Sequence, residues 1–139
     1  MAKKLKADSN FIPCPVADGD ELYPNGIFVF NITKLLEYIR ENSDDITLEE
    51  VGVSDFPEKF SSLNESHMNS VDISRPVILV EIAPGRYNVI DGNHRMEKAR
   101  RTGVKSIQAY KLNAKQHMRF LTSQRAYISY IEYWNSKLK

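Results

Sequence analysis

The clearest helical pattern lies in the first third of the chain, in residues 32–42. Four apolar residues recur there at helical spacing, namely Ile32, Leu35, Leu36 and Ile39. The positions between them are mostly charged or polar, so one face is apolar and the opposite face is polar. Asn31 comes directly before the pattern, and asparagine caps helix N-termini through its side-chain oxygen. The pattern predicts an amphipathic helix over residues 32–42.

Strand-like runs dominate the second half of the chain. Residues 76–82 are rich in valine and isoleucine and end at the turn sequence APGR. A run of this kind indicates a buried strand, and residues 87–90 would pair back across the turn as a hairpin. Residues 106–112, SIQAYKL, supply another strand. We expect these three strands in one mixed sheet.

A helix is predicted between the last two of these strands. The pattern becomes helical after Gly92, and Gly103 stands where a glycine ends many helices. We therefore predict a helix over residues 93–101 that crosses from the strand at 87–90 to the strand at 106–112. This arrangement is a strand–helix–strand unit.

A long helix is predicted over residues 114–139, with Asn113 as its N-cap. Its apolar residues lie near one stripe, at Leu121, Ile128, Ile131 and Leu138, with aromatic residues beside them at Phe120, Tyr127, Tyr130 and Trp134. A stripe this wide should be covered. We expect packing on the same domain through Phe120, Leu121, Ile128 and Ile131. Some of Tyr130, Tyr133 and Trp134 would then remain for a partner chain, which makes a homodimer one expectation.

The remaining segments carry weaker patterns. Residues 1–10 are polar and lysine-rich and predict a mobile tail, residues 11–112 the folded domain, and residues 113–139 a helix packed on it. The run FIPCPV (11–16) predicts an edge strand broken by two prolines. Pro24, Asn25 and Gly26 predict a turn. Short helices are expected around residues 48–51 and 65–70.

Length and composition bound the class of protein. A chain of 139 residues and 16.0 kDa, with 42% hydrophobic and 27% charged residues, suits one globular domain. A net charge of +1 gives no overall attraction to nucleic acid or membrane, so any anion site must be local. No apolar run is long enough to span a bilayer, and the basic start lacks a signal-peptide core. We expect no membrane association and a cytoplasmic location.

Cysteine and histidine offer few candidates for chemistry. Cys14 is the single cysteine, so it forms no internal disulfide, and we expect it to be a small buried residue. His67 and His117 stand in polar surroundings and are predicted to be surface residues, because two isolated histidines do not make a metal site.

The strongest chemical signal is the turn between residues 87–90 and the helix after it. A strand that ends at Ile90, a tight turn at Asp91 and Gly92, and a helix start point backbone N–H groups at one spot, which favours anions. Gly92 lets the backbone approach a ligand, and His94 and Arg95 add donors. A phosphate fits this description.

A plainer interpretation of the same turn stays open. Asp91 can cap the helix while Gly92 makes the turn. The basic residues that follow would then form a solvated helix face: Arg95, Lys98, Arg100 and Arg101. The residues alone do not separate the two interpretations, because one glycine and one His-Arg pair make a short signature.

The stretch VIDGNHRMEKARRTGVKSIQAYKL resembles the core motif of the ParB/sulfiredoxin superfamily, a strand, Asp-Gly-x-His-Arg, a helix, a glycine and a closing strand. The resemblance covers residues 11–112 and is strongest after Arg75. It implies an α/β (α+β) fold, a mixed sheet with flanking helices. It also implies a nucleotide phosphate site, which holds CTP in ParB proteins and ATP in sulfiredoxins. The phosphate-binding residues would be Gly92, Asn93, His94 and Arg95, with Lys98 one turn further on.

Departures from these relatives restrict the chemistry. Sulfiredoxins carry their reacting cysteine where this chain has Asn93, so sulfiredoxin chemistry is not expected. ParB partition proteins continue into a helix-turn-helix and a dimerisation domain, whereas only 27 residues follow Leu112 here, so specific operator binding is not expected. The related free-serine kinases have Asp-Gly-His-His-Arg, which differs from Asp91 to Arg95 only at Asn93, and use an N-terminal acidic residue as a base. By resemblance, Asp20 and Glu21 are candidates for that base.

Phosphoryl transfer or hydrolysis would need charge stabilisation, a divalent metal and a group that orients the nucleophile. Arg95 and His94 could stabilise phosphate charge. An acid could take a proton or Mg²⁺, and the candidates are Asp18, Asp20, Glu21 and Asp91. The first hypothesis is thus a nucleotide-binding protein that uses ATP or CTP with Mg²⁺, as an NTPase or kinase.

Two alternatives belong to other classes. A nucleic-acid-binding or ParB-like nuclease protein would use a local basic patch made of Arg95, Lys98, Arg100, Arg101, Lys105 and Lys111. A non-catalytic interaction protein would use its aromatic C-terminal helix to bind a partner or a second copy.

Overall fold

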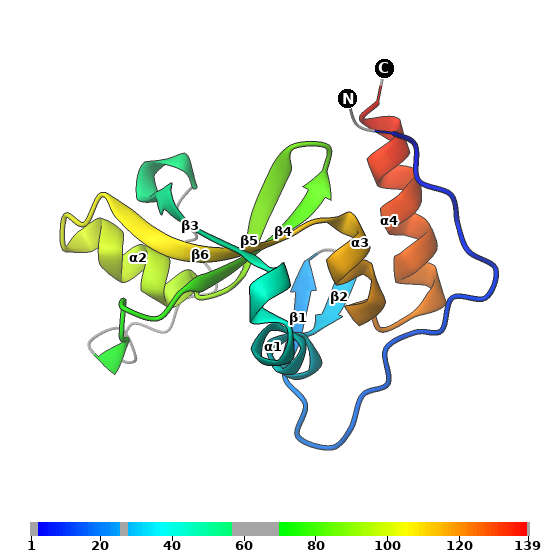
Figure 1. Ribbon diagram of the computed structural model, residues 1–139, viewed down its shortest axis with the longest axis horizontal. Coiled ribbons are helices and arrows are strands. Elements are labelled where there is room, and N and C mark those ends of the chain that lie inside the picture. Colours follow the sequence, from blue (N-terminus) through cyan, green and yellow to red (C-terminus); the bar gives the residue numbers. More distant parts are fainter. Residues whose placement is uncertain (1–2, 26–27, 57–69, 139) are drawn as a thin grey trace.

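The computed structural model describes residues 3–25, 28–56 and 70–138 (Figure 1). Six strands and four α-helices are present in this part of the chain, in the order β1 (Leu22–Asn25), β2 (Phe28–Asn31), α1 (Ile32–Glu41), β3 (Thr47–Gly52), β4 (Val77–Ala83), β5 (Arg86–Asp91), α2 (Asn93–Arg101), β6 (Ser106–Leu112), α3 (Ala114–His117) and α4 (Gln124–Ser136). Short 3-10 turns lie at Ser43–Asp45, Val53–Asp55 and Met118–Phe120. The protein is therefore of mixed α and β type.

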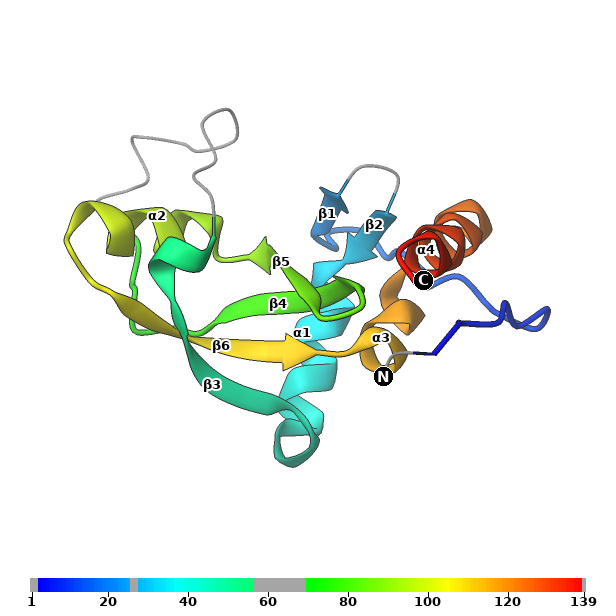
Figure 2. The ribbon, with the colours of Figure 1, turned by 90° about the horizontal axis from the view of Figure 1, so that it is seen from above.

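A four-stranded mixed sheet with the order β3-β6-β4-β5 forms the centre. Strands β4 and β5 make the predicted antiparallel hairpin, and β4 runs parallel to β6, with Val77 opposite Ala109. Helix α2 connects β5 to β6, so the predicted strand–helix–strand unit and mixed sheet are confirmed. Figure 2 shows α2 at one end of the sheet and α4 at the other.

Side chains from the two faces of this sheet enter two separate cores. On β4, Ile78 and Val80 pack towards α1, α3 and α4, whereas Val77 and Leu79 pack towards Met96 of α2. Alternate residues of a strand point to opposite faces, so one valine- and isoleucine-rich run supplies both cores. This explains why the β4 sequence reads as a continuous apolar run rather than an alternating one.

Helix α1 forms as the sequence predicts. The side chain of Asn31 accepts a hydrogen bond from the backbone N–H of Lys34, and Ile32, Leu35 and Ile39 are buried. Helix α2 ends in a Schellman motif, in which the N–H of Val104 donates to the carbonyl of Ala99 and Gly103 adopts a φ of 78°.

Several local predictions in the first half are wrong. Residues 48–51 belong to β3, an edge strand that pairs with β6 along its whole length, rather than to a helix. Residues 11–16 form no strand, and Pro24 and Asn25 belong to β1, which pairs with β2 as a second hairpin. Gly26, the last residue of the predicted turn, and most of the helix predicted at 65–70 lie outside the described residues.

The C-terminal segment is two helices rather than one. The chain turns at Leu121 and Thr122, where the Thr122 N–H and hydroxyl both donate to the carbonyl of Val29. Helix α4 then starts afresh, with the hydroxyl of Ser123 as its cap, accepting from the N–H of Ala126. A hydrogen-bonded contact with β2, invisible to the periodicity, breaks the predicted helix.

The aromatic residues of α4 are covered within the chain. Tyr130 and Trp134 are 0% and 5% exposed, so of the three aromatic residues expected to include a partner contact only the half-buried Tyr133 is accessible. Phe120, Leu121 and Ile131 are buried as predicted, and Ile128 packs at the edge of the same core. Part of the cover comes from residues 3–11, which lie along α4 in place of the predicted tail (Figure 1).

Burial was predicted correctly for the single cysteine but not for His117. Cys14 is buried, as expected, and burial raises the pKa of its thiol. His117 was predicted at the surface but is completely buried between α4 and the sheet, whereas His67 lies outside the described residues. No helix in the described part of the chain is long and apolar enough to cross a bilayer.

Candidate functional site

The turn between β5 and α2 is built around Gly92. Its φ is 99°, in the left-handed region, and its carbonyl accepts the first helical bond, from the N–H of Met96, at 2.9 Å. A Cβ at this position would lie 2.6 Å from Cγ1 of Val77, so only glycine fits between the turn and β4. No side chain caps α2, because its N-cap residue is Gly92 itself. The first-turn amides belong to Asn93, His94 and Arg95.

Asp91 does not cap the helix, so the plainer interpretation is wrong on this point. It is the last residue of β5, and its carboxylate accepts a hydrogen bond of 3.1 Å from the guanidinium of Arg95 one turn into α2. The carboxylate is thereby directed at a side chain rather than at the amides of the helix start.

A hollow of about 450 Å³ opens beside this turn. The described residues that line it are Glu21, Ser70, Val71, Asp72, Arg75, Asp91, Gly92, His94 and Arg95. The hollow therefore joins five of the predicted site residues, Glu21, Asp91, Gly92, His94 and Arg95, from two distant parts of the chain. Glu21 is held at the start of α1, where its N–H donates to the Thr33 hydroxyl at 2.8 Å and its carbonyl accepts from the N–H of Ile32 at 2.8 Å.

Arg95 has an internal role that the sequence did not reveal. Its guanidinium donates to the carbonyls of Pro76 and Arg75, at 2.5 and 3.4 Å, and forms the ion pair with Asp91. The side chain is only 12% exposed. Arg95 thus ties the start of β4 to the start of α2. Because Asp91 already pairs with its guanidinium, a ligand would have to share the positive charge of Arg95 with the Asp91 carboxylate.

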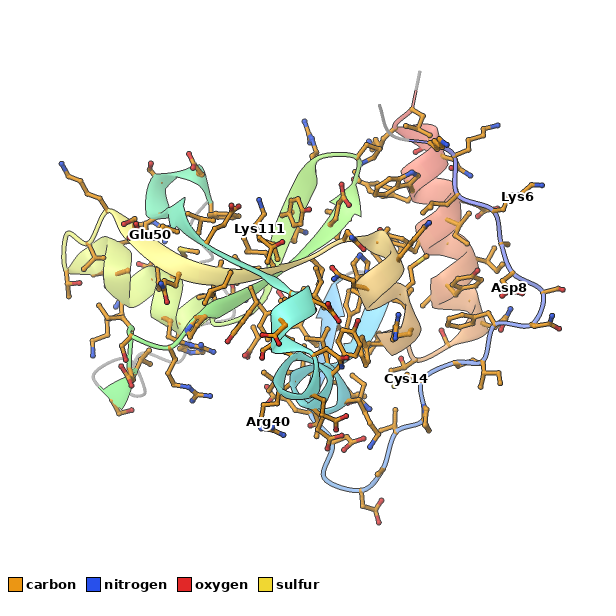
Figure 3. The ribbon with its side chains drawn as sticks, viewed as in Figure 1. Lys6, Asp8, Cys14, Arg40, Glu50 and Lys111 are labelled. Atoms are coloured by element: carbon orange, nitrogen blue, oxygen red, sulfur yellow. The ribbon has the colours of Figure 1, made fainter. Side chains whose placement is uncertain are left out.

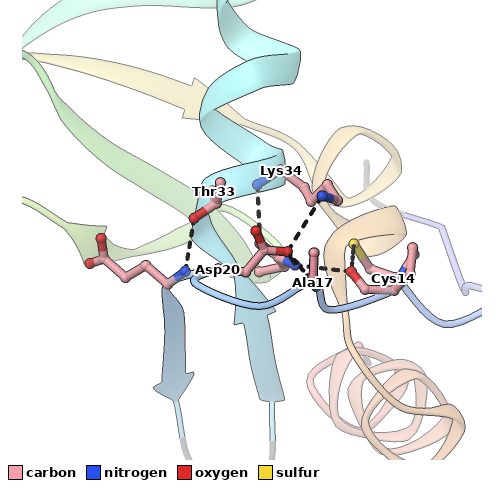
Figure 4. A network of polar contacts seen from close by, with 8 residues as sticks. Cys14, Ala17, Asp20, Thr33 and Lys34 are labelled. Atoms are coloured by element: carbon pink, nitrogen blue, oxygen red, sulfur yellow. Dashed lines mark hydrogen bonds and ion pairs between the residues drawn. The ribbon is translucent and has the colours of Figure 1, made fainter.

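Asp20 is separated from the hollow and supports α1 instead (Figure 4). Its carboxylate accepts from the side-chain amide of Asn31 and from the N–H of Ala17, both at 2.9 Å, and lies 3.4 Å from the ammonium of Lys34. The bond from Asn31, then that from Ala17, lower the pKa of Asp20. The prediction that Asp20 is catalytic therefore finds no support, and the neighbouring Asp18 is exposed in the turn.

Lys98 acts on the wall of the hollow rather than in it. Its ammonium donates to the carbonyl of Val71 at 2.7 Å, which fixes this segment against α2. Lys98 and Asn93 were both predicted to bind phosphate, but neither is among the described residues that line the hollow.

Asp72 and Arg75 are lining residues that sequence reasoning missed. Asp72 accepts from the N–H and the hydroxyl of Ser74, and these two bonds lower the pKa of its carboxyl. Arg75 is an exposed residue of the same lining. No periodicity or motif marks these residues, because they reach the hollow only through the tertiary position of the segment before β4.

Carboxylates outnumber arginines around the hollow: Glu21, Asp72 and Asp91 line it together with Arg75 and Arg95, with His94 beside them. No group of three His, Cys, Asp or Glu side chains that could hold a metal ion occurs in the described ranges. Anion binding at the hollow would depend on the backbone amides, His94 and the arginines.

The predicted basic patch is partly neutralised by acids. Arg100 and Arg101 both pair with Glu97 on α2, and Lys111 pairs with Glu49 of β3 at 2.7 Å. Figure 3 places Lys111 on the middle of the sheet beside β3, apart from the α2 helix. These ion pairs leave less free positive charge for a nucleic-acid backbone than the sequence suggests.

No protein-family model, no curated protein and no solved structure matches this chain.

Proposed function

We propose that the hollow beside the Gly92 turn binds the phosphates of a nucleotide. The observation that carries the proposal is the fit of Gly92 against Val77, which fixes a left-handed turn and directs an uncapped helix start at a hollow lined by His94 and Arg75. Backbone amides and the helix dipole at such a start favour anions. The resemblance to ParB/sulfiredoxin proteins, in which the same turn holds ATP or CTP, supports a nucleoside triphosphate.

The contacts of each residue suggest its role. The amides of α2, the His94 imidazole and the Arg75 guanidinium would bind phosphate oxygens, while Arg95 keeps the turn in place through Pro76. Three carboxylates line the same hollow, and they would repel a bare triphosphate. A nucleotide that carries Mg²⁺ on its phosphates would offset that repulsion.

A transfer or hydrolysis step would be served by Glu21. It lines the hollow together with His94, although the two residues are far apart in sequence. A carboxylate opposite a phosphate site can orient or deprotonate an attacking hydroxyl or water. We therefore propose an NTP-hydrolysing or phosphoryl-transferring activity with Glu21 as the base, and Asp91 as the group that orients Arg95. The nucleic-acid alternative is less favoured because four of its six basic residues, Arg95, Arg100, Arg101 and Lys111, form ion pairs with acids.

Arg75→Ala should weaken nucleotide binding by about ten- to a hundredfold, the loss expected from removing one charge-assisted hydrogen bond. Arg75 is a better probe than Arg95, because its side chain is exposed at the hollow whereas Arg95 also holds the fold together. The measurement is calorimetric titration of ATP, CTP and GTP, with and without Mg²⁺.

Arg86→Ala is the matched control, since Arg86 is an exposed arginine on the β4–β5 hairpin and does not line the hollow. It should bind nucleotide as the wild type does. Failure of the wild type to bind any of the three nucleotides under either condition would refute the proposal. DNA retention that falls steeply with salt would instead favour the nucleic-acid alternative.

A further inference from the structure

Residues 3–11, which we call the N-terminal strap, are bound to α4 mainly through their main chain. The side-chain amide of Asn135 accepts from the Leu5 N–H at 2.8 Å and donates to the Leu5 carbonyl at 2.9 Å. The Trp134 indole N–H donates to the carbonyl of Lys3 at 2.9 Å, and the Asp8 N–H donates to the Tyr127 hydroxyl at 2.8 Å. Three side chains of one helix face thus recognise an extended backbone.

Two apolar side chains of the strap add packing to this recognition. Phe11 lies flat on Tyr127, with ring centroids 3.8 Å apart and 2° between the planes, and Leu5 packs against the same core. Lys6 points away from α4 into solvent (Figure 3). The α4 face therefore binds the strap as a peptide, through main-chain hydrogen bonds and an apolar residue at each end.

The link between the strap and the rest of the domain is irregular and exposed. Residues 12–20 contain no helix or strand, and their first backbone bond to the domain runs from the Cys14 N–H to the Leu121 carbonyl, at 2.9 Å. Ile12 and Val16, on either side of Cys14, are 81% and 50% exposed. These are the two most exposed of the large apolar side chains in the described residues, and the single chain gives them nothing to pack on.

We propose that the α4 face is a peptide-docking site that exchanges the N-terminal strap with a second copy of the chain. A strap from the partner would make the same hydrogen bonds and the same Phe11 stacking, so the interactions broken within one chain form again between two chains. The two links would cross near Cys14, where Ile12 and Val16 of both copies can cover one another. Because association costs entropy, the exchanged dimer forms at high protein concentration.

Two full-length variants test the exchange by complementation. The strap-defective chain carries Leu5→Ala and Phe11→Ala and keeps an intact α4 face. The site-defective chain carries Asn135→Leu and Trp134→Phe and keeps an intact strap. Trp134 is the single tryptophan of the sequence, so fluorescence in a mixture reports only the α4 face of the strap-defective chain.

Each variant alone should be a monomer, and the strap-defective chain should emit at longer wavelength than the wild type. Mixing them should reverse that shift and produce a species of twice the mass in sedimentation. A matched control replaces the exposed Lys6 with alanine in the site-defective chain and should complement equally well. No shift and no heavier species at high concentration would overturn the proposal.

Circular dichroism confirms that each variant is folded before mixing. If the double variants are too unstable, the single changes Phe11→Ala and Asn135→Leu can be mixed, with mass alone as the readout. Complementation should then still produce the heavier species, and its absence from a mixture of folded single variants would again overturn the exchange.

Discussion

Gly92→Ala is expected to lower the free energy of unfolding by about 3 kcal/mol, combining two costs of about 1–3 kcal/mol each. The first cost is backbone strain, because Gly92 has a φ of 99° and side chains rarely tolerate this conformation. The second is overpacking, because the new methyl would lie 2.6 Å from Cγ1 and 3.0 Å from Cβ of Val77. Val77 is completely buried in the sheet and cannot move aside.

Gly103→Ala is the matched control for this change. Gly103 also has a positive φ, of 78°, but a Cβ there meets no atom within 4 Å. It should therefore cost only the backbone strain, about 1 kcal/mol. Urea unfolding of both variants measures the difference, and equal losses would show that the contact with Val77 does not constrain the turn. The Gly92→Ala protein that remains folded should also bind nucleotide more weakly, because the turn that directs the backbone amides of the first turn of α2 has changed.

Local signals account for what could be predicted of the fold. Asn31 as a cap, Gly103 after a helix and the turn sequence between β4 and β5 act within a few residues of themselves, and the elements they mark are found where expected. Strand β3 has no such signal. Its sequence contains Glu49 and Glu50 side by side, without an alternating pattern, and it becomes a strand because β6 offers a full row of backbone partners.

The candidate site likewise contains residues that local sequence signals predict and residues that only the tertiary fold brings in. The turn at Gly92 is a local feature and was found from the sequence, whereas Arg75 reaches the hollow only through the tertiary fold. Asp20 and Glu21 could not be told apart because they are neighbours. In the structure the Asp20 carboxylate is directed at Asn31 while Glu21 lines the hollow, a distinction that depends on the backbone direction just before β1.

His117 sits in an environment that disfavours its charged form. Its Nε2 lies 2.6 Å from the Glu81 carbonyl of β4, which also accepts from the Tyr130 hydroxyl at 2.6 Å, and Phe30 packs on the ring. Within the described residues, Nδ1 has no hydrogen-bond partner. Burial lowers the pKa of His117 to about 4, and the bond to the Glu81 carbonyl offsets this only in part. The neutral ring, protonated on Nε2 and donating to Glu81, satisfies these contacts.

The contribution of His117 to wild-type stability should therefore fall as the pH drops from about 6.5 to about 4, by about 1.4 kcal/mol per pH unit within this window and about 3 kcal/mol in all. The sign follows because the unfolded chain, with a histidine pKa near 6.5, takes up a proton that the folded chain excludes. His117→Gln keeps an N–H for the Glu81 carbonyl but cannot ionise. Urea unfolding at pH 7, 6 and 5 compares the two proteins, and carboxylates and other histidines cancel in the difference. The wild type should lose stability faster than His117→Gln; parallel slopes would mean that His117 takes up its proton without unfolding the chain.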